Sequence, residues 1–204
     1  IAVSDSIRGF GPLDERVRQT LEAVADFNAA RDDAYAVPPE SGAFLHAMVL
    51  SSGATRALEL GTSYGYSGLW IGAALRRTGG RLITVDREAR KTDLARAHYD
   101  RAGLSDLIET HVGEIHDVIE SLAGPFDFVF VDADKPASLG YVKQLRPKLA
   151  SRAVLVTDNI IGPTGHDWSE FLPYVRSQPE FFSTLCTVGN GMELTVFSGS
   201  EAPA

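Results

Sequence analysis

One stretch of the chain, residues 56–68, limits its fold more than any other. It predicts a short buried strand, a turn punctuated by Gly61, Gly65 and Gly68, and the start of a helix that runs to Arg77. A strand that enters a helix through glycines is typical of nucleotide sites in open α/β sheets. The order of the glycines does not fit the G-x-G-x-x-G pattern of dinucleotide binding, and an ordinary glycine turn is the alternative.

Strand-sized apolar runs alternate with helical patterns through the middle of the chain. They predict strands at residues 81–86, 107–112, 126–132 and 153–157, and helices at residues 88–101, 115–122 and 139–149. Strands that are apolar on both sides and separated by helices indicate a parallel sheet with helices on both faces. The chain is therefore predicted to be a doubly wound α/β protein.

The two ends of the chain extend this core. Apolar residues at helical spacing predict an amphipathic helix over residues 13–31, and Pro39 suits the first turn of a second helix. Near the other end, a helix at residues 168–177 precedes strands at residues 181–188 and 192–197. The short glycine-rich linker between these two strands permits only an antiparallel hairpin, so the sheet is expected to end in an antiparallel strand.

Length and composition bound the class of protein. With 204 residues, of which 44% are hydrophobic, we expect a single domain over residues 1–204. Within it, residues 1–55 would form helices that cover the sheet or a dimer interface, and residues 56–197 would form the α/β core. The last residues, 198–204, are expected to be frayed.

Charge and cysteine content limit which binding partners and which cellular compartment are expected. A formal net charge of -8 argues against a nucleic-acid partner, because binding to phosphates depends on clustered Lys and Arg. The single cysteine, Cys186, cannot form an internal disulfide. The sequence also lacks a signal-peptide pattern and a membrane-length apolar run. We therefore expect a cytoplasmic protein with no membrane role.

Acidic residues stand at the ends of several predicted strands. Asp86, Asp132 and Asp158 each follow an apolar run, and Glu59 lies near the end of the first one. In a parallel sheet these ends lie along one edge, which is where ligands bind in such folds. An acid at the position of Asp86 commonly accepts hydrogen bonds from a ribose diol, which indicates an adenosine-bearing ligand. Because a core does not bury an unpaired carboxylate, we also expect a polar partner for Glu59.

Two of these strand ends offer oxygen ligands for a metal ion. Asp132, Asp158 and Asn159 form the hard donor set that suits Mg²⁺ or Ca²⁺, whereas the alternative is an Asx turn and a loop aspartate. Lys135 follows Asp132 on the same predicted loop. A lysine near a dication and a cationic ligand loses its proton more readily and could act as a base. The alternative is a solvated lysine paired with Asp134.

Three motifs give the chain a family resemblance. They are Leu58-Glu59-Leu60-Gly61-Thr62 with Gly65-Tyr66-Ser67, Val131-Asp132-Ala133-Asp134-Lys135 with Tyr141, and Asp158-Asn159. With these motifs, the chain resembles the cation-dependent class I O-methyltransferases of the catechol and caffeoyl-CoA type over residues 37–197. The resemblance implies a Rossmann-like methyltransferase fold, S-adenosylmethionine as cofactor, a divalent cation (Mg²⁺ above all), a small aromatic hydroxyl substrate and a homodimer.

The resemblance also implies roles for single residues. It assigns Val37, Glu59, Gly61, Thr62 and Ser67 to the methionine part of the cofactor, Asp86 to the ribose, Ile115 to the adenine, and Asp132 to the cofactor's amino end. By the same resemblance, Asp132, Asp158 and Asn159 are the metal ligands and Lys135 is the general base. The segment 160–166 differs from the family's usual sequence at the acceptor pocket, so the acceptor stays open.

Two other functions are compatible with the fold that the sequence predicts. A cofactor-binding sensor or interaction protein without catalysis has no need of Lys135 together with three metal ligands. A methyltransferase that works without metal, on a nitrogen or on nucleic acid, is opposed in its nucleic-acid form by the acidic net charge. The sequence therefore favours a metal-assisted O-methyltransferase.

Overall fold

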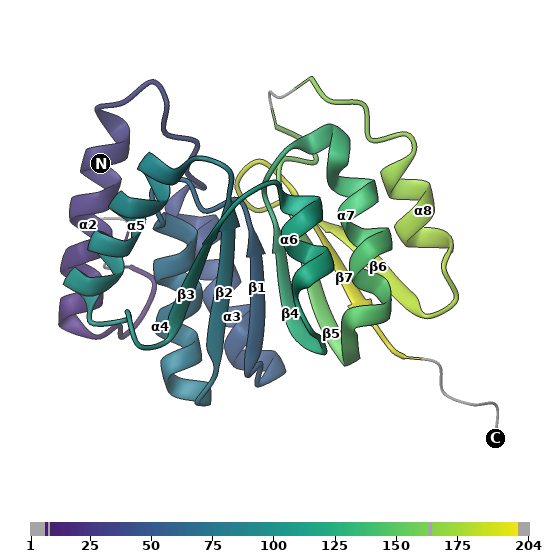
Figure 1. The fold of residues 1–204 in the computed structure, drawn as a ribbon, viewed down its shortest axis with the longest axis horizontal. Helices are drawn as coiled ribbons and strands as arrows, with labels where there is room; N and C mark the ends of the chain where they lie inside the picture. The colour runs from purple at the N-terminus through teal and green to yellow at the C-terminus, as the bar shows by residue number, and fades with distance from the viewer. Residues whose placement is uncertain (1–6, 8, 163–164, 200–204) are drawn as a thin grey trace.

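A seven-stranded sheet organises the computed structural model, which describes residues 7, 9–162 and 165–199. The strand order is β3-β2-β1-β4-β5-β7-β6 (Figure 1). The strands are β1 (Arg56–Leu60), β2 (Arg81–Asp86), β3 (Ile108–Val112), β4 (Phe126–Val131), β5 (Leu149–Thr157), β6 (Phe181–Cys186) and β7 (Met192–Phe197). Strands β1 to β5 pair in parallel, whereas β7 is antiparallel to β5 and β6. The predicted parallel sheet with a C-terminal antiparallel hairpin is confirmed.

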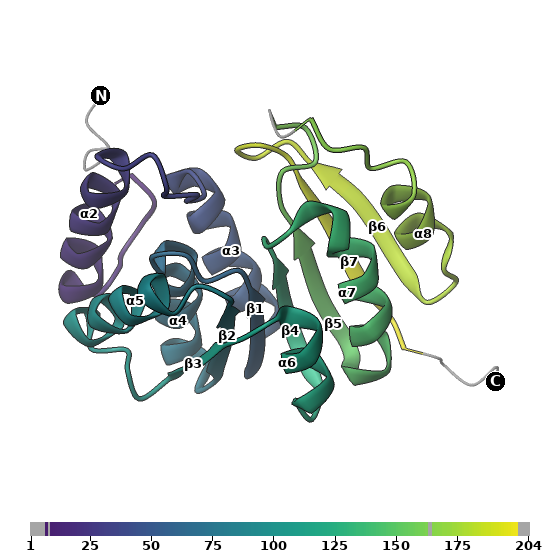
Figure 2. The same cartoon turned by 45° about the horizontal axis from the view of Figure 1, so that its top comes forward.

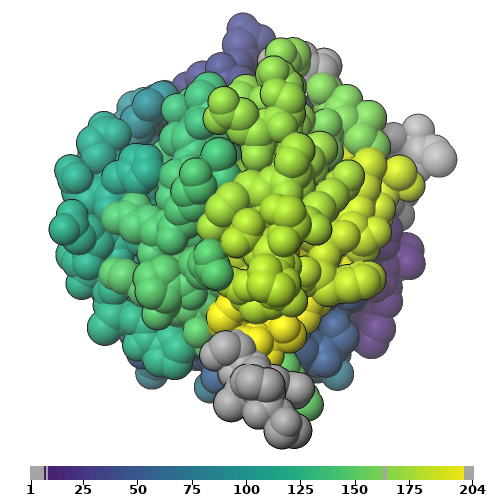
Figure 3. Space-filling model, turned by 90° about the vertical axis from the view of Figure 1, so that its right-hand side faces the viewer, coloured from purple at the N-terminus to yellow at the C-terminus, as the bar shows by residue number. Residues whose placement is uncertain are grey.

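Helices cover both faces of this sheet. They are α2 (Glu15–Ala29), α3 (Pro39–Ser52), α4 (Tyr66–Thr78), α5 (Ala89–Ala102), α6 (Ile115–Ser121), α7 (Ser138–Leu145) and α8 (Phe171–Ser177), with short 3-10 helices at Lys135–Ala137 and Arg146–Lys148. Helices α2 to α5 contribute to the core on one face and α6 to α8 to the core on the other (Figures 1 and 2). At the β6 edge of the sheet, α8 and β6 lie on the surface of the molecule (Figure 3).

The strands serve both cores because their side chains alternate between the two faces. In β1, Ala57 joins the core under α2 to α5, whereas Leu58 and Leu60 join the core under α6 to α8. This is why a central parallel strand such as β4 is apolar at nearly every position rather than at every second one.

Some element boundaries differ from the sequence predictions for local reasons. Helix α4 begins at Tyr66 rather than at residue 69, because Gly65 adopts a left-handed conformation with φ 83° and turns the chain directly into the helix. Helix α7 ends at Leu145, ahead of the 3-10 turn that contains Pro147. Proline lacks the backbone N–H that a longer helix would need.

Other predictions lie partly outside the described residues. The single-domain assignment includes residues 1–6, the frayed end includes residues 200–204, and the acceptor segment includes residues 163–164. The domain assignment stays a prediction. Among the helices that the structure describes, none is both long and apolar enough to cross a membrane.

Candidate active site

The register of the parallel strands brings the predicted site residues together. Leu60, the last residue of β1, is aligned with Val85 of β2 and Val131 of β4. Asp86, the last residue of β2, and Asp132, which follows β4, therefore lie at the same edge of the sheet, on either side of the turn that follows β1. The strand order also reverses between β1 and β4, which is the point where open α/β sheets bind ligands.

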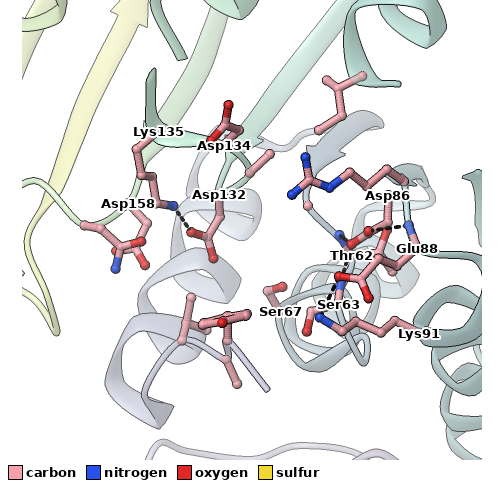
Figure 4. A pocket seen from close by; sticks show the side chains of 18 of the residues that line it. Thr62, Ser63, Ser67, Asp86, Glu88, Lys91, Asp132, Asp134, Lys135 and Asp158 are labelled. Atoms are coloured by element: carbon pink, nitrogen blue, oxygen red, sulfur yellow. Dashed lines mark hydrogen bonds and ion pairs between the residues drawn. The ribbon is translucent and has the colours of Figure 1, made fainter. Parts of the chain in front are cut away.

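A cavity of about 1000 Å³ lies at this edge of the sheet (Figure 4). Its wall contains all of the predicted site residues except Glu59: Val37, Gly61, Thr62, Ser67, Asp86, Ile115, Asp132, Lys135, Asp158 and Asn159. Figure 4 shows Asp132, Lys135 and Asp158 grouped on one side of the cavity and Asp86 on the other. The side chains proposed for the cofactor and for the metal therefore share one cavity.

Gly61 fixes the path of the turn that begins this cavity. Its φ is 101°, and a side chain at this position would collide with the backbone oxygen of Asp132. The amide of Gly61 donates to Val85 O at 2.9 Å, and the amide of Asp132 donates to Leu60 O at 2.9 Å. Glycine is thus required here because the turn runs against the end of β4.

Asp86 has a structural task that the sequence did not predict. Its Oδ2 accepts hydrogen bonds from the backbone amides of Thr62 at 3.0 Å and Ser63 at 2.7 Å. Its Oδ1 accepts from the amide of Glu88 at 2.9 Å. The carboxylate holds the glycine turn in shape, including Ser63 with its positive φ of 46°, while it also faces the cavity.

Glu59 lies beneath the cavity and is completely buried. Its Oε2 accepts a hydrogen bond from Thr84 Oγ1 at 2.6 Å, and this threonine is the polar partner that the sequence implied without identifying. The other oxygen, Oε1, has no hydrogen-bond partner among the described residues. Burial raises the pKa of Glu59 to about 7, although the hydroxyls of Ser67 and Thr84 lower it in part.

Asp158, which is buried, and Asp132, whose side chain is 14% exposed, stand together on the side of the cavity opposite Asp86. Burial, followed by repulsion from Asp132, raises the pKa of Asp158 to about 7. Burial also raises the pKa of Asp132, and Lys135 opposes that effect. Asp158 Oδ1 is buried and has no hydrogen-bond partner in the described part of the chain. An orphaned oxygen beside a second carboxylate and the amide of Asn159 fits a hard cation.

The donor set is small. Within the described residues, no group of three or more His, Cys, Asp or Glu side chains is placed to hold a metal ion. The set predicted from the sequence contains two carboxylates and one amide, Asn159, whose backbone is held in the left-handed region with φ 66°. Water or substrate oxygens would have to complete the six-coordinate shell that Mg²⁺ prefers.

Lys135 does not pair with Asp134, the partner expected for a solvated lysine on this loop. Its Nζ forms an ion pair with Asp132 Oδ1 rather than with Asp134, and its side chain is 16% exposed (Figure 4). Lys135 begins the short 3-10 helix after β4, which turns its side chain back to the strand end. A solvated lysine on an open loop is therefore excluded.

The wall of the cavity beyond Ile115 contains side chains that sequence reasoning missed. His116 Nδ1 lies 2.9 Å from Gln144 Oε1, and Gln144 Nε2 donates to His116 O at 2.9 Å. The His116 ring also packs against Tyr141, with 4.7 Å between ring centroids. These contacts join the start of α6 to α7. No spacing in the sequence signals a pair that lies 28 residues apart.

Fold and site together define the class. This is a doubly wound α/β protein with a ligand cavity where the strand order reverses, and with acids from four strand ends in or under that cavity. Comparison with known proteins identifies the family within that class.

A family model described as a methyltransferase domain matches residues 58–160. A catechol O-methyltransferase of Mycobacterium tuberculosis is 39% identical over 141 residues, which are 68% of this chain and 63% of that protein. An O-methyltransferase of Bacillus cereus, solved in complex with SAH, is 31% identical with a TM-score of 0.80 over 91% of this chain and 92% of that one. TomG of Streptomyces achromogenes, an O-methyltransferase involved in tomaymycin synthesis and solved with SAM, is 30% identical with a TM-score of 0.78 over 92% of each chain.

The chain belongs to the methyltransferase family, among the O-methyltransferases of the catechol and caffeoyl-CoA type. The resemblance drawn from its three motifs is thereby confirmed. The aligned region spans less than two thirds of the mycobacterial relative's length.

Proposed function

We propose that this protein transfers a methyl group from S-adenosylmethionine to one hydroxyl of a small aromatic acceptor with two adjacent hydroxyls, with the help of a divalent cation. The observation that carries the proposal is the cluster of Asp132, Lys135 and Asp158 in the same cavity as the glycine turn. Family membership supports the methyl transfer, and the solved relatives in complex with SAH and SAM support the cofactor.

The donor half of the cavity is suited to S-adenosylmethionine. Backbone groups at Gly61 and Thr62, with Val37 and Ser67 beside them, would enclose the methionine part. Asp86 Oδ1 accepts one hydrogen bond within the protein and would accept others from the ribose hydroxyls, and Ile115 would pack on the adenine. The bound cofactor supplies a methyl group on a positively charged sulfur, which is a good leaving group.

The acceptor half is suited to a cation and to proton removal. Asp132, Asp158 and Asn159 would hold the ion, for which Mg²⁺ fits the oxygen donors. When bound, the ion would supply a Lewis acid that two adjacent hydroxyls of the acceptor can chelate, and it would lower the pKa of one of them. Lys135 would serve as the general base that takes the hydroxyl proton. The new oxygen–methyl bond replaces the carbon–sulfur bond, whose electron pair stays on sulfur.

Positional isomers of the acceptor test this proposal. With labelled S-adenosylmethionine and Mg²⁺, catechol should be methylated at least about 100-fold faster than resorcinol, because only adjacent hydroxyls can chelate one ion and be aligned by it. Both isomers carry two phenolic hydroxyls on the same ring, so they match in size and polarity. Equal rates would exclude the chelating acceptor, and the absence of transfer to any phenol would exclude the reaction.

A further inference from the structure

A short segment between α2 and α3 covers part of the cavity. We call residues 33–37 the strap. Ala34, Tyr35, Ala36 and Val37 of the strap belong to the cavity wall. The Tyr35 residue is nevertheless 76% exposed, whereas Val37 is 5% exposed. The strap is thus anchored at its end by Val37 and open to solvent in its middle.

The start of the strap is tied to the glycine turn and to α5. Asp33 Oδ2 accepts hydrogen bonds from Tyr64 Oη at 2.8 Å and from Arg90 Nη2 at 2.6 Å. The same Arg90 nitrogen lies 3.1 Å from Tyr64 Oη. The Tyr64 hydroxyl, followed by Arg90, lowers the pKa of Asp33, so these bonds are made to the charged carboxylate. We call these three residues the latch.

The latch joins the packed Tyr64 to the exposed side chains of Asp33 and Arg90. The Tyr64 residue is 1% exposed, its ring stands edge-on to Phe27 at 5.1 Å, and its backbone oxygen lies 2.8 Å from His98 Nδ1. By contrast, the side chains of Asp33 and Arg90 are 44% and 60% exposed. The turn therefore keeps its position if the latch opens, whereas the strap loses the bonds that hold its first residue.

A second contact holds the middle of the strap. The Nζ of Lys91 lies 5.3 Å from the centre of the Tyr35 ring. Lys91 is buried in the cavity wall and pairs with Glu88 at 2.8 Å. In each contact the partner on the strap, Asp33 or Tyr35, is exposed to solvent, and polar and cation–π contacts of exposed groups are worth little. A segment held by them opens easily compared with the packed core.

We propose that Asp33, Tyr64 and Arg90 act as positioning residues that close the strap over the donor half of the cavity and set how long the cofactor or its product stays bound. The inference rests on the proposed function, because it takes the donor half to bind S-adenosylmethionine. It assigns a role in retaining the cofactor to three residues that hold the strap and do not take part in the chemistry, of which Tyr64 also belongs to the cavity wall.

Three substitutions test the latch: Tyr64→Phe, Asp33→Asn and Arg90→Ala. Each should raise the dissociation rate of S-adenosylhomocysteine about threefold to tenfold, because the strap loses hydrogen bonds to a charged group. Turnover at saturating cofactor and acceptor should not fall, because no reacting group changes. Arg96→Ala is the matched control: Arg96 lies on the same helix and pairs with Asp93 at 2.6 Å, but it makes no contact with the strap in the described structure.

Proteolysis reports on the strap itself. Chymotrypsin should cut after Tyr35 several-fold faster in the three latch variants than in the unchanged protein or in Arg96→Ala, and S-adenosylhomocysteine should slow that cut. The melting temperature of each ligand-free variant separates opening of the strap from general unfolding. Unchanged dissociation and cleavage rates in Tyr64→Phe would overturn the latch while leaving the proposed function intact. If the unchanged protein did not bind S-adenosylhomocysteine, both would be overturned.

Discussion

Replacing Lys135 with Ala is expected to lower turnover by about 100-fold to 10,000-fold, the range that general bases contribute. The Nζ of Lys135 pairs with Asp132 at the edge of the acceptor half, which is where a hydroxyl held by the proposed cation would lose its proton. The affinity for S-adenosylhomocysteine should change by less than about twofold, because the residue faces the acceptor rather than the donor half. Single-turnover rates and equilibrium binding measure the two quantities separately.

Two further variants separate a base from a countercharge. Lys135→Arg keeps a positive charge for Asp132, but a guanidinium stays protonated and cannot take the hydroxyl proton. We therefore expect Lys135→Arg to be about as slow as Lys135→Ala. Lys143→Ala, which alters an exposed lysine on α7, should have ordinary turnover. Recovery of activity in Lys135→Arg would mean that Lys135 serves only to balance the charge of Asp132.

Replacing Glu59 with Gln is expected to change stability and cofactor binding in opposite directions. Burial raises the pKa of Glu59 from 4.5 to about 7, so the folded protein binds this proton more tightly than the unfolded chain does. The stabilisation from that proton is present at low pH and is lost as pH rises through this window. Between about pH 5 and pH 8, the difference in unfolding free energy should shift in favour of the Gln variant by on the order of 2–3 kcal/mol.

A second buried glutamate provides the matched control for this substitution. Glu193 is also completely buried, but both of its oxygens accept from Arg176 at 2.8 Å. Glu193→Gln should destabilise the fold, because the guanidinium loses its charged partner. Urea titrations of both variants at several pH values make the comparison. If the difference in unfolding free energy between Glu59→Gln and the unchanged protein did not vary with pH, the pKa of Glu59 would be the same in the folded protein and in the unfolded chain, and the raised pKa would be excluded.

The cofactor reverses the sign of the effect at Glu59. The positive groups of S-adenosylmethionine favour the ionised carboxylate, so the neutral Gln side chain should weaken binding about tenfold to 100-fold at about pH 8. A variant that is more stable and yet binds more weakly points to a carboxylate retained for its ligand. Cofactor affinity equal to that of the unchanged protein would remove Glu59 from the binding site.

Much of the fold could be predicted because its signals are local. A short apolar run that ends in an acid is enough to predict a strand such as β2 or β4. The segments between these runs show helical spacing, so each element can be predicted from a few neighbouring residues. The common edge of a parallel sheet then gathers Asp86, Asp132 and Asp158 without any knowledge of side-chain contacts. Element ends were predicted less well where a single residue decides them, as Gly65 does at the start of α4.

Contacts between distant residues could not be predicted from the sequence. Thr84 meets Glu59 from a neighbouring strand 25 residues away, and a threonine inside an apolar strand gives no sign of which carboxylate it will meet. Arg90 reaches Asp33 across 57 residues. Such pairs depend on how helices settle on the sheet, which the helical periodicity of α2 and α5 does not specify. The roles of single residues toward cofactor and metal, and the homodimer, stay predictions.

The most direct test of the central claim is the rate of labelled methyl transfer to catechol with and without divalent ions. After treatment with a chelator, the rate should fall by at least about 100-fold, because the acceptor hydroxyl is no longer held and acidified by the ion. Added Mg²⁺ should restore it, since the oxygen donors of Asp132, Asp158 and Asn159 suit that ion. A rate in chelator equal to the rate with Mg²⁺ would contradict a metal-assisted methyltransferase.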